Sequence, residues 1–360
     1  MGKVRGNLLP PALAILFSAL LCGIALVVSG ANPLRAFGAM VTQVGEGTTA
    51  VDIVNSTGTY YIAALAVAIG FQMNLFNIGV EGQYRVAAVV AAVFGGSVAL
   101  PPGIHTLAII LVAALAGAAW AAIPAILKVT RGVNEVISTI MMNGLALGLA
   151  AYLIRDDVFG ELRGNNIRTP EIPTSGWVPG ISLGSSGTIF GLVFLAAALG
   201  IAYWVMMNRT RFGFELRASG ESSTAAAAGG VSAKKMILVA MLLSGAIAGL
   251  VSMPEILGRD HTYNLNFPAG IGFSGIAVAL LGRNHPGGIA FGALLWAFLD
   301  KSGLALDNVG VSREIVTIMQ GAIVLSVVVA YEVVRRYELA AEQRRVGRQL
   351  GTVEPVGGAA

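Results

Sequence analysis

The sequence predicts an all-α polytopic membrane protein with about ten transmembrane helices, some of them broken. Hydrophobic residues make up 56% of its 360 residues and charged residues only 12%, whereas a soluble domain carries about 25% charged residues. The mean hydropathy is +0.77. The apolar residues form continuous runs, which disfavours a transmembrane β-barrel because barrel strands alternate apolar and polar residues. A lipid bilayer is the solvent that this composition requires.

Ten apolar runs approach or exceed the about 20 residues that a helix needs to cross a bilayer. They form two groups of five, and a polar stretch separates the groups. The runs lie near residues 9–30, 58–76, 84–100, 104–127 and 134–154, and near 188–207, 236–253, 269–283, 286–300 and 313–331. We therefore predict two weakly repeated halves, with both termini on the same side of the membrane.

Lysine and arginine predict which side that is. With the N-terminus in the cytoplasm, 16 of the 23 basic residues fall in inner segments and 7 in outer segments. Because basic residues accumulate on the cytoplasmic side, both termini are predicted to lie inside. The pI near 9.3 follows from this topology and does not indicate binding to nucleic acid.

The polar segments divide the chain further. Residues 1–335 are predicted to form the transmembrane permease domain, and residues 336–360 a charged cytoplasmic tail. An outer loop over about 155–187 is rich in proline, glycine and serine. A cytoplasmic loop covers about 208–235. Its centre, 222–230, has hydroxyl groups that can cap a helix, then four alanines and two glycines, so we expect a short helix between two spans.

A first polar cluster, residues 72–83, interrupts the second apolar run with amides, glycines and one carboxylate. Polar groups at membrane depth are costly, so each such cluster is a candidate functional site. One interpretation is an ordinary cytoplasmic turn. The other is a broken helix that borders a transport pathway, as recurs at binding sites inside membranes.

A second polar cluster, residues 131–143, opens the fifth span. Glu135, Ser138 and Thr139 share one helix face, and Asn143 continues this stripe loosely. The stripe fits a polar pathway, and it fits equally well hydrogen bonding between spans.

A third cluster, residues 270–288, consists of two short apolar segments around a break at Pro286. It repeats the broken-helix pattern of the first cluster in the other half of the chain. Such paired interruptions point to a central site between the halves. His285, next to Arg283, fits a solvated turn better than a proton carrier.

Motifs of catalysis are missing. The three histidines lie far apart in the sequence, and neither a His-Glu-x-x-His motif nor a P-loop occurs. The single cysteine, Cys22, lies in the first apolar run and is expected to be a small buried hydrophobe. We predict no enzyme activity, no metal site and no ATPase site, so ATP-driven work requires another subunit.

Four segments resemble one family. Residues 76–83 resemble the hallmark segment of the permeases of simple-sugar and nucleoside ABC importers, which belong to a wider group with ribose and branched-chain amino-acid permeases. Residues 131–143 and 272–283 resemble two further segments of that family. Residues 214–230 are similar to the cytoplasmic coupling loop that docks on the ATPase, although Ser222 and Ser223 stand where the family often has asparagine. The resemblance runs in register from about 58 to 330, and it is strongest to the nucleoside branch.

The resemblance implies a permease subunit of an ATP-driven importer in the bacterial inner (plasma) membrane. It would form the translocation pathway for a nucleoside or simple sugar. Its implied partners are an ABC ATPase subunit with two nucleotide-binding cassettes, a second permease that is a different chain, and an extracytoplasmic solute-binding protein. The ATPase would use ATP and magnesium, and this chain would need no cofactor.

Two sets of candidate site residues follow, and neither is catalytic or metal-binding. We expect the solute pathway to include Asn74, Phe76, Asn77, Glu81, Gln83, Asn134, Glu135, Ser138, Asn143, Phe273 and Ser274. We expect coupling to the ATPase to involve Glu215, Arg217, Gly220, Ser222, Ala225 and Gly229. The alternative function is a secondary transporter driven by protons or sodium, with Glu81 or Glu135 as the carrier carboxylate. The short helix of the coupling loop argues against that alternative.

Overall fold

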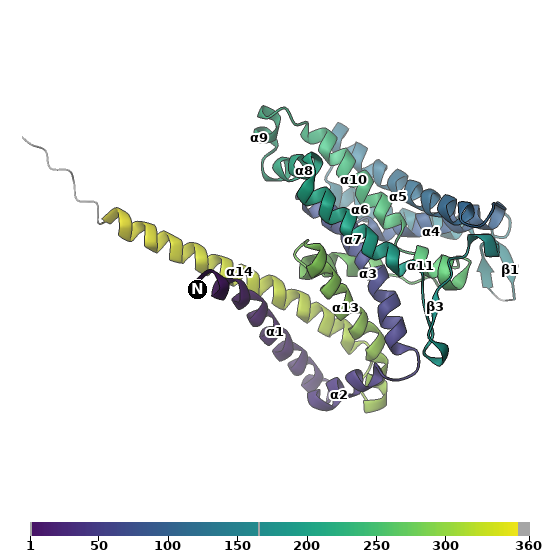
Figure 1. Ribbon diagram of the computed structural model, residues 1–360, viewed down its shortest axis with the longest axis horizontal. Helices are drawn as coiled ribbons and strands as arrows, with labels where there is room; N and C mark the ends of the chain where they lie inside the picture. The colour runs from purple at the N-terminus through teal and green to yellow at the C-terminus, as the bar shows by residue number, and fades with distance from the viewer. Residues whose placement is uncertain (1, 165, 352–360) are drawn as a thin grey trace, which may run out of the picture. The chain divides into compact units, whose positions relative to one another are not determined.

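The computed structural model describes residues 2–164 and 166–351, and it is almost entirely helical (Figure 1). The chain forms two compact units. The larger unit is Val41–Ser302, and the smaller unit combines Met1–Met40 with Gly303–Ala360. The prediction of an all-α polytopic membrane protein is confirmed.

The larger unit contains the main helical bundle. Its long helices are α3 (Thr49–Phe71), α4 (Val80–Ser97), α5 (Ile104–Arg131), α6 (Glu135–Leu153), α7 (Val193–Arg209), α10 (Ala233–Gly249) and α13 (Pro286–Ser302). Its short helical elements are η1 (Thr174–Gly176), η2 (Gly184–Ser186), α8 (Arg211–Glu221), α9 (Ser223–Ala228), α11 (Met253–Glu255), the π-helical η3 (Ile256–Asp260) and α12 (Ile271–Leu281).

Each of the ten predicted apolar runs falls on a helix. Among the described residues, six helices are long and apolar enough to cross a membrane, or up to eight if each of two bent pairs is one span. Two predicted runs are missing from the count of eight: α12 has only 11 residues, and α4, with 18 residues, carries Glu81, Gln83 and Arg85 in its first two turns and is not apolar enough. The number of spans and their orientation stay predictions.

Helix α3 is the core of the larger unit, since every residue from Tyr61 to Gly70 is buried. A helix that is apolar on all sides requires neighbours on all sides. Helices α5 and α10 meet at glycines, where a Cβ on Gly117 would overlap the backbone of Gly245 and Gly249. Small residues at a helix interface let two backbones approach closely, which is how helices in a bilayer gain packing energy.

The smaller unit contains α1 (Gly2–Val28) and α14 (Ile315–Gly351), which pack against each other, and η4 (Gly303–Val309). Cys22 of α1 is buried as expected, and its thiol lies 3.8 Å from the backbone carbonyl of Met319. Helix α2 (Pro33–Gln43) follows α1 in the chain. Of the predicted tail, residues 336–351 continue α14, and residues 352–360 lie outside the described residues.

The two predicted loops contain more regular structure than expected. The outer loop forms two short hairpins, β1 (Glu161–Arg163) with β2 (Asn166–Arg168), and β3 (Ile181–Ser182) with β4 (Thr188–Ile189). In the segment 208–235, which we predicted to be cytoplasmic, the expected short helix is α9, and Ser222 caps it by accepting a bond from the Ala225 amide (3.2 Å). Helix α8 precedes it at an angle of 71° to α7.

Candidate functional site

The first polar cluster lies at an interruption between two helices, because α3 ends at Phe71 and α4 begins at Val80, and we call residues 72–79 the first break. Asn77 is 1% exposed and holds this break together. Its side-chain nitrogen donates to Gln83 Oε1 (3.1 Å) and Ser244 Oγ (2.8 Å), and its oxygen accepts from Gln83 Nε2 (3.0 Å). Every polar group of the Asn77 side chain therefore has a partner within the chain.

The carboxylate of Glu81 joins the first cluster to the third. It accepts bonds from the backbone amides of Gly270 (2.8 Å) and Gly272 (2.9 Å) at the start of α12. It also accepts bonds from the Tyr84 hydroxyl (3.0 Å) and Arg85 Nε (3.0 Å). A carboxylate at a helix N-terminus satisfies free amides and favours the helix dipole, so Glu81 fixes where α12 begins.

Asn143 joins the second cluster to the first. Its side-chain oxygen accepts from the Gly82 amide (2.8 Å), and its nitrogen donates to the Ile78 carbonyl (3.0 Å). The absence of a side chain at Gly82 permits this approach, because a Cβ there would lie 3.0 Å from the Asn143 Cα. The sequence thus places α6 directly against the break before α4.

The polar stripe of α6 lies on its buried face, as its spacing predicts. Glu135, Ser138 and Thr139 are all buried. Glu135 pairs with Lys128 Nζ at 2.5 Å, which ties α6 to the end of α5. Ser138 donates to the carbonyl of Asn134 (3.1 Å), whose own side chain caps α6.

Four other predicted pathway residues have side chains that are exposed or half-buried. Phe76 and Phe273 each have 51% of their surface exposed, and Ser274 is half-buried. Asn134 is exposed at the start of α6. These four residues, unlike Asn77, offer surface that a solute can contact.

The predicted coupling residues lie on α8 and α9, and α8 docks on the first break. A Cβ on Gly220 would lie 2.8 Å from the Cα of Met73, so only glycine allows this contact. Asn74 Nδ2 donates to the Gly220 carbonyl (2.8 Å). Asn74, which we expected in the solute pathway, is therefore the residue of the break that bonds to α8 in the predicted coupling loop.

The other coupling residues stabilise the loop itself. Glu215 pairs with Arg211 at 2.6 Å, and the Arg217 guanidinium donates to the Met207 carbonyl at the end of α7. Gly229 ends α9, and Ala225 lies on it with an exposed surface. The loop is thus a folded structure with a defined attachment to the bundle.

Sequence reasoning missed Tyr203, which connects the first and third polar clusters through Gln72 and Asn284. Tyr203 of α7 is 2% exposed and accepts a bond from Gln72 Nε2 (3.1 Å). Its hydroxyl donates to the carbonyl of Asn284 (2.8 Å), which lies in the second break, residues 282–285 between α12 and α13. A tyrosine near the end of an apolar run is typical of a membrane interface, so the sequence offered no signal that Tyr203 is buried.

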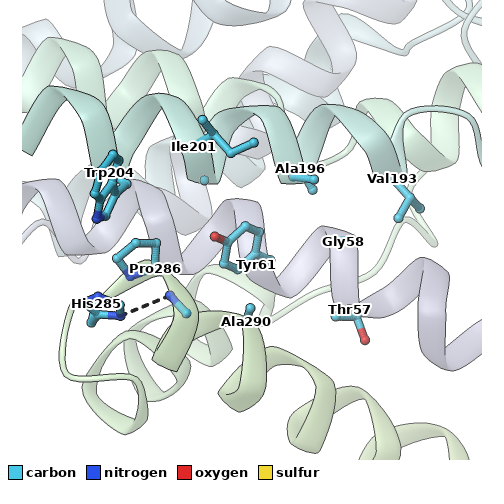
Figure 2. A pocket seen from close by; sticks show the side chains of 13 residues that line it. Thr57, Gly58, Tyr61, Val193, Ala196, Ile201, Trp204, His285, Pro286 and Ala290 are labelled. Atoms are coloured by element: carbon cyan, nitrogen blue, oxygen red, sulfur yellow. Dashed lines mark hydrogen bonds between the residues drawn. The ribbon is translucent and has the colours of Figure 1, made fainter.

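A groove of about 520 Å³ lies between α3, α7 and α13. Figure 2 shows Tyr61 between these helices, with Trp204 and His285 at one end and Val193 at the other. Its lining is mostly apolar, and none of the predicted pathway residues contributes to it. The groove therefore adjoins the end of the third cluster at His285, Pro286 and Gly287 and is separate from the first two clusters.

Two histidines that lie far apart in the sequence meet the same turn of the outer loop. His105 Nδ1 lies 2.8 Å from Ser175 Oγ, and the His261 ring stacks on Trp177 with centroids 3.8 Å apart. Burial lowers the pKa of His261, because it disfavours the charged form. Within residues 2–164 and 166–351, no group of three histidine, cysteine or acidic residues has a geometry that could hold a metal ion.

Comparison with known proteins agrees with this architecture. A family model described as branched-chain amino acid transport system / permease component matches residues 49–328. The chain is 34% identical over 343 residues to the guanosine ABC transporter permease protein NupP of Bacillus subtilis, covering 92% of this chain and 96% of the relative. It is 32% identical over 346 residues to the glucose ABC transporter permease protein TsgB13 of Haloferax volcanii, covering 91% and 89%.

A third relative is the nucleoside ABC transporter permease protein NupB of Lactococcus lactis, which is 30% identical over 341 residues, covering 92% of this chain and 93% of the relative. No solved structure matches the chain significantly. The resemblance inferred from the four sequence segments is confirmed. The chain belongs to the family of branched-chain amino acid transport system permease components and is a multi-pass permease subunit of an ABC transporter.

Proposed function

We propose that this permease forms the translocation pathway of an importer for nucleosides. The observation that carries the proposal is that Asn74 of the first break bonds to α8 of the predicted coupling loop, and we call α8 the coupling helix. Bonds from Glu81 and Asn143 join the three polar clusters beside this contact. Two of the three relatives described above are named as guanosine or nucleoside permeases. A simple sugar is the second candidate solute, because another relative is named as a glucose permease.

The complete importer requires other subunits. We propose an ABC ATPase that uses ATP and magnesium, a second and different permease chain, and an extracytoplasmic solute-binding protein, all at a bacterial inner membrane. The absence of a P-loop from the sequence supports the assignment of ATP hydrolysis to a partner. This chain then needs no cofactor of its own.

Within the pathway, we assign solute contact to Phe76, Asn134, Phe273 and Ser274, whose surfaces are available. The phenylalanine rings can stack on a base or on the apolar face of a sugar. The buried polar residues have a different task in this proposal, which is to hold the helices that present these four side chains. These residues are Asn77, Glu81, Gln83, Glu135 and Ser138, together with the half-buried Asn143.

The bonding of Glu81 also bears on the alternative of a proton- or sodium-driven transporter. A carrier carboxylate must bind and release its ion during each cycle. Glu81 instead accepts four bonds from the chain, two of them from the backbone of α12. This supports a positional role for Glu81 and the ATP-driven mechanism.

The test is uptake of labelled nucleosides and simple sugars by cells that express the chain with its candidate ATPase, with and without an inactivating substitution in that ATPase. We expect nucleoside uptake that disappears when the ATPase is inactive. Uptake that survives inactivation and collapses with the ion gradient contradicts the proposal and supports the secondary transporter.

A further inference from the structure

Both breaks in the bundle contain backbone that L-amino acids rarely adopt. Asn74 in the first break has φ of 54°, and Arg283 and Asn284 in the second have φ of 53° and 58°. Residues other than glycine occupy this left-handed region at an energetic cost, so it persists only where surrounding structure holds it. The conformation of each break therefore depends on the contacts that hold it.

Helices α7 and α8 hold both breaks. The carbonyl of Gly220, at the end of α8, accepts the bond from Asn74 (2.8 Å). The hydroxyl of Tyr203, on α7, donates to the carbonyl of Asn284 (2.8 Å). Gln72 then closes the connection, because its amide donates to the same Tyr203 hydroxyl (3.1 Å).

These contacts make the first break, α7 and the second break one hydrogen-bonded unit. Gly220 leaves no free space against the backbone of Met73, so α8 cannot shift toward α3 without moving residues 72–74. Any movement of Gln72 acts on Tyr203, and Tyr203 is bonded to Asn284. Coupling between distant sites needs such an element, one whose arrangement both sites can change.

We propose that Tyr203 is a positioning residue that transmits movement of the coupling helix to both broken spans. The proposal rests on the proposed function, since it assumes that an ATPase moves α8. The hydrogen bonds from Gln72 to Tyr203 and from Tyr203 to Asn284 couple the two breaks, so that both change conformation in the same transport cycle. Without the Tyr203 hydroxyl, ATP hydrolysis continues but moves only the first break.

A purely structural role for Tyr203 gives a different expectation. The tyrosine ring fills space in the bundle, and the substitution Tyr203→Phe keeps that ring while removing both hydrogen bonds. If packing were the whole role, Tyr203→Phe would leave transport coupled to hydrolysis. The chain also offers a matched control in Tyr61 on α3. Its side chain is buried, and within the described part of the chain its hydroxyl has no hydrogen bond.

The experiment measures ATP hydrolysis and solute uptake by the complete transporter in the same proteoliposomes, with the solute that the wild-type complex takes up in the cellular panel. We expect Tyr203→Phe to assemble normally and to lower uptake per ATP hydrolysed roughly tenfold, because both hydrogen bonds that join the two breaks are lost. Gln72→Met removes the hydrogen bond from Gln72 to the Tyr203 hydroxyl and should also lower uptake per ATP hydrolysed. Tyr61→Phe should match the wild type.

Two results overturn the proposal in distinguishable ways. If Tyr203→Phe and Gln72→Met both keep the wild-type ratio of uptake to hydrolysis, the positioning role is wrong while the importer function stands. If the wild-type complex itself shows no ATP-dependent uptake, the proposed function fails, and this inference fails with it.

Discussion

Removing the carboxylate of Glu81 should destabilise the larger unit, because Glu81 accepts four hydrogen bonds while 6% exposed. In Glu81→Ala, the amides of Gly270 and Gly272 lose their acceptor, and the buried Arg85 loses its partner. Leaving a buried charge without its partner costs about 3–5 kcal/mol. Glu81→Gln keeps one oxygen but places an amide donor near backbone donors, and we expect a loss of about 1–3 kcal/mol.

The assay is the free energy of unfolding of the purified protein in mixed detergent micelles, from titration with a denaturing detergent. Glu46→Gln is the matched control, because Glu46 is an exposed carboxylate, and a surface substitution is expected to change stability by less than about 0.5 kcal/mol. The reasoning is refuted if Glu81→Ala is as stable as the control. A carrier role would appear differently, as wild-type stability combined with loss of dependence on the ion gradient.

Three further substitutions test other contacts. Asn77→Ala should lower the free energy of unfolding by about 1–3 kcal/mol, because Gln83 and Ser244 lose buried partners; a change within the error of the same titration would contradict this. Burial lowers the pKa of His261, so the folded protein should lose stability as the pH falls below the ordinary value of about 6.5. The melting temperature of His261→Gln should lack this pH-dependent component, and equal slopes for both proteins would show that His261 is not the cause. Gly220→Leu should lower uptake per ATP hydrolysed roughly tenfold while the complex still assembles, because a side chain there collides with Met73; unchanged substrate-stimulated hydrolysis and uptake would argue against docking of α8 at this site.

The elements that the sequence predicts well are those with local causes. The break over residues 72–79 follows from three closely spaced amides, Gln72, Asn74 and Asn77, and from Gly79. The polar face of α6 follows from helical spacing. The capping of α9 by Ser222 is likewise a local feature. Each of these depends on residues within about one or two helical turns, which a sequence pattern records directly.

The features that the sequence does not predict depend on contacts between segments that are distant along the chain. Asn77 is an amide in a break, and nothing local indicates that Ser244, on α10, completes its hydrogen bonds. The bond between Tyr203 and Asn284 likewise joins residues 81 positions apart. Helix α8 was missed for another reason: its N-cap Thr210 accepts a bond from the Gly213 amide, but the polar composition that follows is also typical of a loop.

The relation between buried and exposed polar residues changes how the hallmark segments are understood. Sequence alone groups all of them as candidate solute contacts. The structure divides them into residues whose polar atoms are bonded within the bundle, such as Gln83, and residues with available surface, such as Phe76. Substitutions in the first group should therefore affect stability first, and substitutions in the second group should affect transport first.

The central claim is that this chain carries a nucleoside across the membrane at the expense of ATP hydrolysed by a partner. The most direct test is accumulation of labelled guanosine by proteoliposomes that contain the permease, its ATPase, the second permease and the binding protein, with no ion gradient. The account predicts accumulation that requires ATP and is abolished when the ATPase is inactivated. Accumulation that requires an imposed proton or sodium gradient and proceeds without ATP would contradict it.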